Sequence, residues 1–435
     1  MGRFSFIVCH SALSEESHCY FHRHNIVMQK EYIKVIVGSG KDQSLRRFHP
    51  WVFSGAIKKI KNADGKGEVV PEEGDIVEVY DNKDEYLGTG HYQIGSIAIR
   101  IFSFAENLPA GRQVNPDKNF WQQKIKLAYD YRKQLGLIDN ANTNVYRLIF
   151  AEGDGLPGLV IDWYNGTAVI QTHSIGMHLI KNEITEALKE IYGDKLKAVY
   201  DKSEETLPKM SKVKAINGYL FGKAETNEVI ENNCKFHIDW EGGQKTGFFI
   251  DQRENRKLLA EYSKDKAVLN TFCYTGGFSV YAAKAGAKLV HSVDSSKKAI
   301  ELTDKNITLN NISNHQSFAE DTFDYLDKNK NAYDVIILDP PAFAKHRDAK
   351  HHAVMGYKRL NSEAMKQIKP GGILFTFSCS QVVDKKMFES TIMASAIIAK
   401  RNVRVLHHLS QPPDHAANIF HPEGEYLKGL VVHVE

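Results

Sequence analysis

The spacing of apolar residues divides the chain into regions with different patterns. Between residues 32 and 106, short runs such as "DIVEVYD" and "SIAIRIFSF" alternate apolar and polar positions, and turn residues separate them. This pattern predicts a small β-barrel. Between residues 107 and 230, segments with helical spacing, such as "HLIKNEITEALKEIYG", are mixed with strand-like runs. That mixture predicts a small α+β domain.

Residues 231–435 instead alternate strand and helix. The strand-like runs "KAVLNTF", "LVHSVDSS", "YDVIILDPP" and "GGILFTFSCS" are separated by segments with helical spacing. This order predicts an α/β fold with a parallel, doubly wound sheet, Rossmann-like, that binds ligands at the C-terminal ends of its strands. Residues 1–31 share none of these patterns. We expect them to be a disordered tail, and Met28 is a candidate for the natural start.

Composition excludes several classes of protein. The chain has 435 residues, of which 42% are hydrophobic and 25% charged, as in ordinary globular proteins. The formal net charge is +3, so a nucleic-acid-binding surface would have to be local. No apolar run approaches the ~18 residues that span a bilayer, so we expect no membrane partner. Five cysteines without a C-x-x-C spacing predict a reduced, cytoplasmic protein. The sequence leaves open whether the protein forms a homodimer.

A cofactor site is predicted where the first strand of the α/β region ends. That strand runs into the turn "NTFCYTGGFS", which opens a helix and can hold a nucleotide-like cofactor. Asp294 ends the next strand, where an acid can bind ribose hydroxyls, and Asp321 follows a third strand, near the expected adenine. The turn has only the pair Gly276–Gly277, without the three spaced glycines of a dinucleotide site. S-adenosylmethionine (SAM) is therefore favoured over a nicotinamide cofactor.

Asp339 and Cys379 end two further strands of the predicted sheet. Asp339 begins "DPPAF", in which the prolines hold the backbone extended and present the acid beside a transferable methyl group. Cys379 ends "FTFSC", and for any cysteine after an apolar strand packing is the more common role. Because the C-terminal ends of parallel strands face one crevice, the thiol and the acid can also act on one substrate.

Seven segments, in this order along the chain, resemble a known family. They are "SLRRFHPWVFSGAI", "AEGDGLPGLVID", "GGQKTGFFIDQRENR", "LNTFCYTGGFSVYAAKAGA", "ILDPPAFAK", "FTFSCS" and "DHAANIFHPEGEYLKG". The chain resembles the class I SAM-dependent 23S (large-subunit) ribosomal RNA cytosine-5 methyltransferases with an N-terminal PUA domain. The resemblance implies a PUA RNA-binding domain at 32–106, a middle domain at 107–230 and a methyltransferase domain at 231–435. It also implies SAM as cofactor and large-subunit ribosomal RNA as partner.

The same resemblance implies roles for individual residues. The implied SAM contacts are Gln244, Phe248, Phe272, Tyr274, Gly276, Phe278, Asp294, Asp321 and Asp339. Cys379 becomes the nucleophile that attacks carbon 6 of a flipped cytosine, and Asp339 the acid that holds the edge of that base. An RNA N-methyltransferase acting on guanine, with Cys379 structural, is the alternative, because acid–proline–proline–aromatic sequences also resemble enzymes that methylate amino groups. A non-catalytic RNA-binding protein is disfavoured by the complete series of three acids.

Basic residues in two places predict RNA contacts, and no metal is assigned. Arg46 and Arg47 lie in "RRFHPW", and Lys345, Arg347 and Lys358 follow the strand of Asp339. For each residue alone a solvated charge is the simpler interpretation, but as a group they favour RNA binding. The acidic turn "AEGDG" lacks the rest of a calcium loop, and the two N-terminal cysteines match no common zinc pattern.

Overall fold

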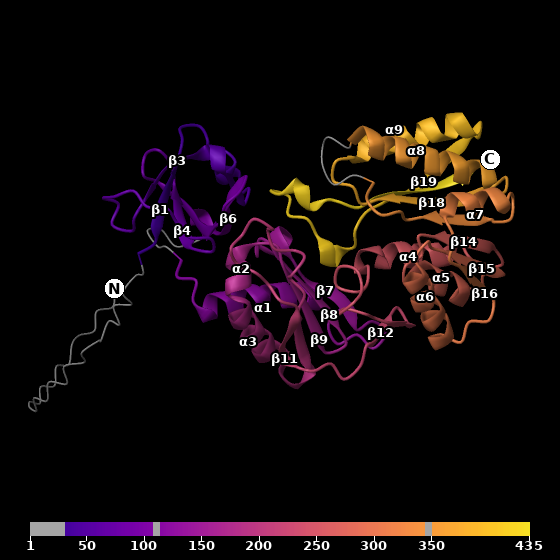
Figure 1. Cartoon of the computed structure of the whole chain (residues 1–435), viewed down its shortest axis with the longest axis horizontal. Helices are drawn as coiled ribbons and strands as arrows, with labels where there is room; N and C mark the ends of the chain where they lie inside the picture. The colour runs from indigo at the N-terminus through magenta and orange to yellow at the C-terminus, as the bar shows by residue number, and fades with distance from the viewer. Residues whose placement is uncertain (1–30, 108–113, 344–349) are drawn as a thin grey trace, which may run out of the picture. The chain divides into compact units, whose positions relative to one another are not determined.

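The computed structural model describes residues 31–107, 114–343 and 350–435. Residues 32–435 form one compact unit, in which three successive parts each contain a larger β-sheet (Figure 1). The predicted tail, except for its last residue, and the predicted RNA contacts Lys345 and Arg347 lie outside the described residues. Within the described ranges, every helix is too short or too polar to span a bilayer.

The first part has the predicted short strands. Its single sheet has the strand order β2-β6-β5-β4-β1-β3. The strands are β1 (Ile33–Val37), β2 (Trp51–Phe53), β3 (Ile57–Lys61), β4 (Ile76–Tyr80), β5 (Tyr86–Tyr92) and β6 (Ile97–Phe104). Val35 and Val37 of β1 lie in the apolar core, because alternate side chains of a strand face the same side.

The second part is the predicted α+β region, with the strand order β11-β10-β9-β8-β7. Its strands are β7 (Val145–Phe150), β8 (Leu159–Tyr164), β9 (Thr167–Thr172), β10 (Ala198–Asp201) and β11 (Gly218–Gly222). Its helices are α1 (Lys118–Gln134), α2 (Ile175–Leu179) and α3 (Lys181–Tyr192). Trp121 and Ile125 of α1 and Ile184 and Leu188 of α3 pack in one core with the sheet. Residues four apart share one face of a helix, which explains this packing.

A hairpin leads into the third part. It consists of β12 (Glu228–Glu231) and β13 (Cys234–His237), so the predicted domain boundary between residues 230 and 231 falls inside β12. Glu231 is buried and accepts two hydrogen bonds of 2.8 Å from Arg256, which lies on α4 (Arg253–Glu261). This buried ion pair holds the hairpin to the third part.

The third part contains a seven-stranded sheet with the order β16-β15-β14-β17-β18-β20-β19. The strands are β14 (Ala267–Thr271), β15 (Leu289–Val293), β16 (His315–Phe318), β17 (Val335–Leu338), β18 (Gly372–Ser378), β19 (Val403–Leu409) and β20 (Lys428–Val434). The further helices are α5 (Gly277–Lys284), α6 (Lys297–Leu309), α7 (Thr322–Lys328), α8 (Lys350–Gln367) and α9 (Lys385–Ala399). Strands β14 to β18 run parallel, whereas β20 is antiparallel to both neighbours. The predicted doubly wound sheet is confirmed.

Helices cover both faces of this sheet because strand side chains alternate between the faces. In β17, Ile336 and Leu338 pack with residues of α7, α8 and α9, whereas Val335 and Ile337 pack with residues of α4 and α5. Helices α8 and α9 lie side by side on the first of these faces (Figure 1). A strand that is buried on both faces needs apolar residues at every position, which accounts for the run "VIIL".

Candidate active site

A cavity of about 410 Å³ opens at the C-terminal ends of the parallel strands. Thr271 pairs with Val293 and with Leu338, so the residues after β14, β15 and β17 emerge at the same edge of the sheet. The predicted site residues that line the cavity are Gln244, Phe272, Tyr274, Phe278, Asp294, Asp339 and Cys379. The fold thus brings the predicted cofactor turn, acid and thiol into one pocket of a size typical for small ligands.

Three predicted cofactor residues are not among the described residues that line this cavity. Gly276 is buried within the turn, and its neighbour Gly277 lines the cavity instead. Phe248 is buried in the core, whereas Phe249 lines the cavity. Asp321 is the N-cap of α7, where its carboxylate accepts hydrogen bonds of 2.8 and 3.3 Å from backbone N–H groups of the first turn. Its position after a strand is thus explained by helix capping.

The turn after β14 has an unusual backbone. Phe272, Tyr274 and Gly276 have φ angles of 53°, 46° and 71°, and a left-handed conformation costs a non-glycine residue about 1–3 kcal/mol. Asp294 stabilises this turn, because its Oδ2 accepts a hydrogen bond of 3.1 Å from the backbone N–H of Tyr274. Its Oδ1 accepts another, of 2.9 Å, from the N–H of Ser296. The predicted ribose-binding acid is therefore held in place by the turn itself.

Asp339 faces the cavity beside a second acid, Asp251. Burial, and then the charge of Asp251, raise the pKa of Asp339 to about 7. Gln252 donates a hydrogen bond of 3.0 Å to Asp339 Oδ2. Burial alone would raise the pKa of Asp251, but the charges of Lys245 and His415 outweigh it and lower the pKa below its usual value. Two neighbouring acids thus differ in protonation at neutral pH, a pattern typical of catalytic sites.

Asp251 and Gln252 were missed by the sequence analysis. Both lie in the segment "QKTGFFIDQR", which contains the implied SAM contacts Gln244 and Phe248, but no periodicity there indicates which side chains face inward. Tyr426 donates a hydrogen bond of 2.5 Å to Asp251 Oδ2. No described residue hydrogen-bonds to the other oxygen, Oδ1, although it is buried. A carboxylate oxygen of this kind is a candidate acceptor for a ligand that carries positive charge or N–H groups.

Cys379 directly follows β18 and is partly exposed, on the cavity side. Burial of the thiol, and then the nearby Asp339, raise its pKa above the usual value, whereas the charge of Lys245 acts in the opposite direction. A second cation, the Lys428 ammonium, donates hydrogen bonds of 2.7 Å to the carbonyl oxygens of Ser380 and Tyr426. Its burial lowers the pKa of Lys428 to about 8. The thiol is therefore mostly protonated in the free protein.

The predicted RNA contacts in the described residues differ in their surroundings. Arg46 lies against three carboxylates, those of Asp42 at 2.7 Å, Asp81 at 2.9 Å and Glu85 at 2.7 Å. Its charge is therefore already paired within the protein, and a phosphate contact by Arg46 stays a prediction. Arg47 is exposed, and Lys358 is half-buried on α8.

Two parts of the chain match known protein families. Residues 158–418 match the S-adenosylmethionine-dependent methyltransferase family, and residues 35–104 match the PUA-like domain. Together with the fold and the cavity, these matches define a SAM-dependent methyltransferase with an N-terminal PUA-like domain. They confirm the predicted fold class and the predicted cofactor.

Full-length relatives identify the family more closely. Ribosomal RNA large subunit methyltransferase I from Aeromonas hydrophila is 38% identical over 403 residues, which cover 90% of this chain and 97% of the relative. The protein of the same name from Shewanella frigidimarina is 39% identical over 411 residues, which cover 92% and 99% of the two chains. The chain belongs to the ribosomal RNA large subunit methyltransferase I family.

Solved structures share the fold. A SAM-dependent methyltransferase from Streptococcus mutans has a TM-score of 0.75 and 23% identity, and covers 92% of this chain and 100% of its own. A methyltransferase complexed with SAH has a TM-score of 0.77 and 24% identity, with the same coverage. At these identities the likeness establishes the fold alone.

The cavity fits SAM by the chemistry of its lining. The ionised Asp251 offers a buried oxygen without a described partner to a cationic group, and Asp294 offers a carboxylate next to the turn. Phe272, Tyr274 and Phe249 contribute aromatic surface to the same cavity. A cation with a ribose and an aromatic base would find complementary groups here. The residues that would hold SAM are thus those of the turn, Asp294 and the segment around Asp251.

Gly276→Ala is expected to weaken SAM binding roughly 5- to 150-fold, equivalent to about 1–3 kcal/mol. The φ of Gly276 is +71°, and an added Cβ would lie 2.7 Å from Thr303 Cγ2, so the turn must shift. Isothermal titration calorimetry with SAM measures the effect. Gly286→Ala is the matched control, because Gly286 also has a positive φ of +88°, but its Cβ would meet nothing closer than 3.9 Å. Equal SAM affinity of the two variants would contradict this role of the turn.

Proposed function

We propose that the protein methylates carbon 5 of a cytosine in large-subunit ribosomal RNA, with Cys379 as a covalent nucleophile. The observation that carries the proposal is that Cys379 and Asp339 line one cavity together with the cofactor turn. Large-subunit ribosomal RNA as substrate is supported by the names of the relatives. The PUA-like domain at residues 35–104 is consistent with an RNA substrate.

The chemistry of carbon 5 explains why a thiol is needed. This carbon is a poor nucleophile until the Cys379 thiolate adds to carbon 6 and the electrons of the 5,6 double bond become available at carbon 5. SAM, when bound, supplies an electrophilic methyl group. A base then removes the proton from carbon 5, the double bond re-forms, and the bond between sulfur and carbon 6 breaks. The Cys379 thiolate is thus regenerated at the end of the reaction, as a catalyst must be.

Of the two thiols that line the cavity, Cys379 is better suited to this role. Burial raises the pKa of Cys273 to about 12, and its sulfur lies 3.5 Å from the Thr303 hydroxyl, beneath the turn. Cys379 is more exposed to the cavity and has two lysines, Lys245 and Lys428, close enough to affect its charge. Positive charge nearby favours the thiolate, which is the nucleophilic form.

Asp339 is suited to hold the pyrimidine edge. With a pKa of about 7, a large fraction of its carboxyl groups is protonated at neutral pH. A protonated carboxyl can donate a hydrogen bond to N3 of cytosine, and this bond stabilises the electron density that thiolate attack pushes into the ring. The hydrogen bond that Asp339 Oδ2 accepts from Gln252 orients the acid.

The fate of the hydrogen at carbon 5 tests the proposal. With ribosomal RNA that carries tritium at carbon 5 of cytosine, each methyl transfer should release one tritium to water. Methylation of a guanine amino group, the alternative predicted from sequence, would transfer methyl groups without any release. Nucleoside analysis of the digested RNA should show 5-methylcytidine. Methyl transfer without tritium release would overturn the proposal in favour of that alternative.

Asp339→Asn is expected to lower the rate of methyl transfer about 10²- to 10³-fold and to change its pH dependence. The thiolate fraction of Cys379 rises about tenfold per pH unit below its pKa, while protonated Asp339 falls about tenfold per unit above pH 7. The wild-type rate should therefore rise with pH up to about 7 and then level off. The Asn variant should continue to rise, because the carboxyl no longer titrates.

Single-turnover rates between pH 6 and about 9 measure both effects. Asp334→Asn, which changes an acid that precedes the same strand and pairs with Lys369 at 3.0 Å, is the control. It should keep the wild-type pH profile. Identical profiles for wild type and Asp339→Asn would contradict the assigned role.

A further inference from the structure

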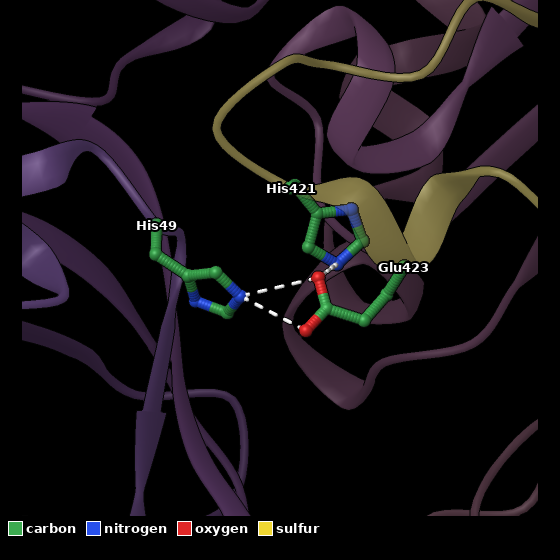
Figure 2. A group of neighbouring side chains, drawn as sticks. All are labelled: His49, His421 and Glu423. Carbon is green, nitrogen blue, oxygen red and sulfur yellow. Dashed lines mark hydrogen bonds and ion pairs between the residues drawn. The ribbon is translucent and has the colours of Figure 1, made fainter.

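His49, His421 and Glu423 form a cluster of possible metal ligands outside the candidate active site (Figure 2). His49 precedes β2 in the PUA-like domain, whereas His421 and Glu423 belong to the connection between β19 and β20. One ligand atom from each side chain lies within 4.8 Å of the other two. No local sequence pattern indicates this cluster, because His49 and Glu423 are 374 residues apart.

The distances between His49 and Glu423 match those between ligand atoms around a zinc ion, and His421 lies slightly farther from Glu423. His49 Nε2 lies 3.4 and 3.3 Å from the two carboxylate oxygens of Glu423, and His421 Nε2 lies 3.8 Å from Glu423 Oε2 (Figure 2). Tetrahedral zinc with bonds of about 2.0–2.1 Å places neighbouring ligand atoms about 3.3–3.4 Å apart. The two histidine nitrogens lie within 4.8 Å of one another, so the histidine side chains would have to move closer together to complete the geometry.

His421 supplies an independent reason to expect a ligand. It is only 4% exposed, and among the described residues neither ring nitrogen has a hydrogen-bond partner. Its ring packs against Trp51 at 4.5 Å and against His49 at 5.5 Å. Burying a polar atom without a partner is unfavourable, because its hydrogen bonds to water are lost. A metal bound to Nε2 would remove that cost for one nitrogen.

The charges around His421 also favour a bound cation. The carboxylates of Glu152 and Glu423 both lie close enough to His421 to interact with its ring electrostatically. Glu152 accepts a hydrogen bond of 2.8 Å from Trp51 Nε1, which holds this second acid near the cluster. Two imidazoles flanked by two carboxylates provide an electrostatic environment that a dication stabilises.

We propose that His49 Nε2, His421 Nε2 and the Glu423 carboxylate bind one divalent transition-metal ion of the zinc class. Two imidazoles and one carboxylate suit Zn²⁺ or Co²⁺ better than Ca²⁺ or Mg²⁺, which prefer oxygen ligands. The fourth position is left for water. Without a metal, the half-exposed Glu423 would only accept a weak hydrogen bond from His49, and His421 would remain without a hydrogen-bond partner among the described residues.

Such an ion would cross-link the PUA-like domain to the methyltransferase sheet. The same contact already includes Phe48 and Phe420, whose rings lie 5.1 Å apart. Three residues beyond Glu423, Tyr426 hydrogen-bonds to Asp251 in the active-site cavity. The metal would therefore stabilise the connection on which that hydrogen bond depends, and would hold an RNA-binding domain to it.

Metal titration of the full-length, chelator-treated protein tests the proposal. In calorimetry, we expect the wild type to bind one equivalent of Zn²⁺ at this site. His421→Gln and Glu423→Gln should lose this binding or show an affinity at least about 10- to 100-fold lower. His408→Gln is the matched control, because His408 forms a similar contact of 3.2 Å with Glu389 on the exposed surface. The wild type and the three variants share the same residues 1–31. Any zinc bound by the cysteines and histidines there therefore contributes equally to all four titrations.

His49→Cys makes a second, positive test. A thiolate at this position should keep the metal and add a thiolate-to-cobalt charge-transfer band to the Co²⁺ spectrum. The additional change His421→Gln should remove that band. Equal zinc stoichiometry and affinity in the wild type, His421→Gln and Glu423→Gln would overturn the proposal, as would the absence of a new band in His49→Cys. These readouts are independent of methyl transfer, so they do not depend on the proposed cytosine chemistry.

Discussion

Cys379→Ala should abolish methyl transfer, with a loss of at least about 10³-fold, while SAM affinity stays close to the wild-type value. Without the sulfur, no adduct forms at carbon 6, and carbon 5 stays a poor nucleophile. The cofactor turn and Asp294 are not altered by this change. Radiolabelled methyl transfer to ribosomal RNA and calorimetry with SAM measure the two quantities.

The covalent step can be trapped directly. RNA in which 5-fluorocytosine replaces cytosine should form a stable adduct with the wild type, because fluorine at carbon 5 cannot leave as a proton does. Cys379→Ala should form none, whereas Cys234→Ala, which removes a thiol in β13 outside the cavity, should form it normally. Full activity of Cys379→Ala, or an active wild type that forms no adduct, would contradict the nucleophile role.

Asp414→Asn is expected to lower the free energy of unfolding by about 3–5 kcal/mol at pH 7, because one partner of a buried ion pair is lost. Asp414 is fully buried, and its two oxygens accept hydrogen bonds of 2.8 and 3.0 Å from the Arg253 guanidinium. It also accepts one of 3.0 Å from the backbone N–H of Arg147 in the middle domain. The variant would leave the buried Arg253 charge with only the half-exposed Glu254 carboxylate, at 3.1 Å, as a counter-charge.

Urea denaturation measures this effect, and its pH dependence has a defined sign. Burial would raise the pKa of Asp414, but the charges of Arg253 and His415 outweigh it and hold the pKa well below its usual range. A lowered pKa stabilises the folded state above the pKa of the unfolded chain, about 3.9, and this contribution is lost as pH falls below that value. The difference between wild type and variant should therefore shrink below about pH 4.

The control for this prediction is Glu190→Gln, which breaks an exposed ion pair of 2.7 Å with Lys118. Exposed pairs contribute about 0–1 kcal/mol, so this variant should unfold almost like the wild type. A loss of less than about 1 kcal/mol for Asp414→Asn would show that the buried pair adds no more stability than a surface pair.

Residues that directly follow strands were predicted well. The apolar runs in the sequence indicated the strands β14, β15, β17 and β18. A parallel sheet brings the C-terminal ends of its strands to one edge, so the sequence alone predicted that Asp294, Asp339 and Cys379 line one pocket. Asp321 follows its strand at a greater distance, and a helix begins directly after it, so its carboxylate caps that helix.

Irregular segments were predicted less well. Phe248 and Phe249 are adjacent in a stretch without helix or strand periodicity, and only packing decides that Phe249 faces the cavity. Asp251 accepts a hydrogen bond from Tyr426, which is 175 residues away along the chain. No local pattern encodes such a contact.

The sequence by itself determined the class of fold, the cofactor turn and the strand-end residues, because the period of apolar residues and the order of strands and helices are local properties. The tertiary structure alone decided which charges are paired. Arg46 was predicted to meet phosphate but lies among three carboxylates, and His49 meets His421 and Glu423. The physical reason is that a side chain's charge and ligand partners depend on distances between remote segments, which only packing sets.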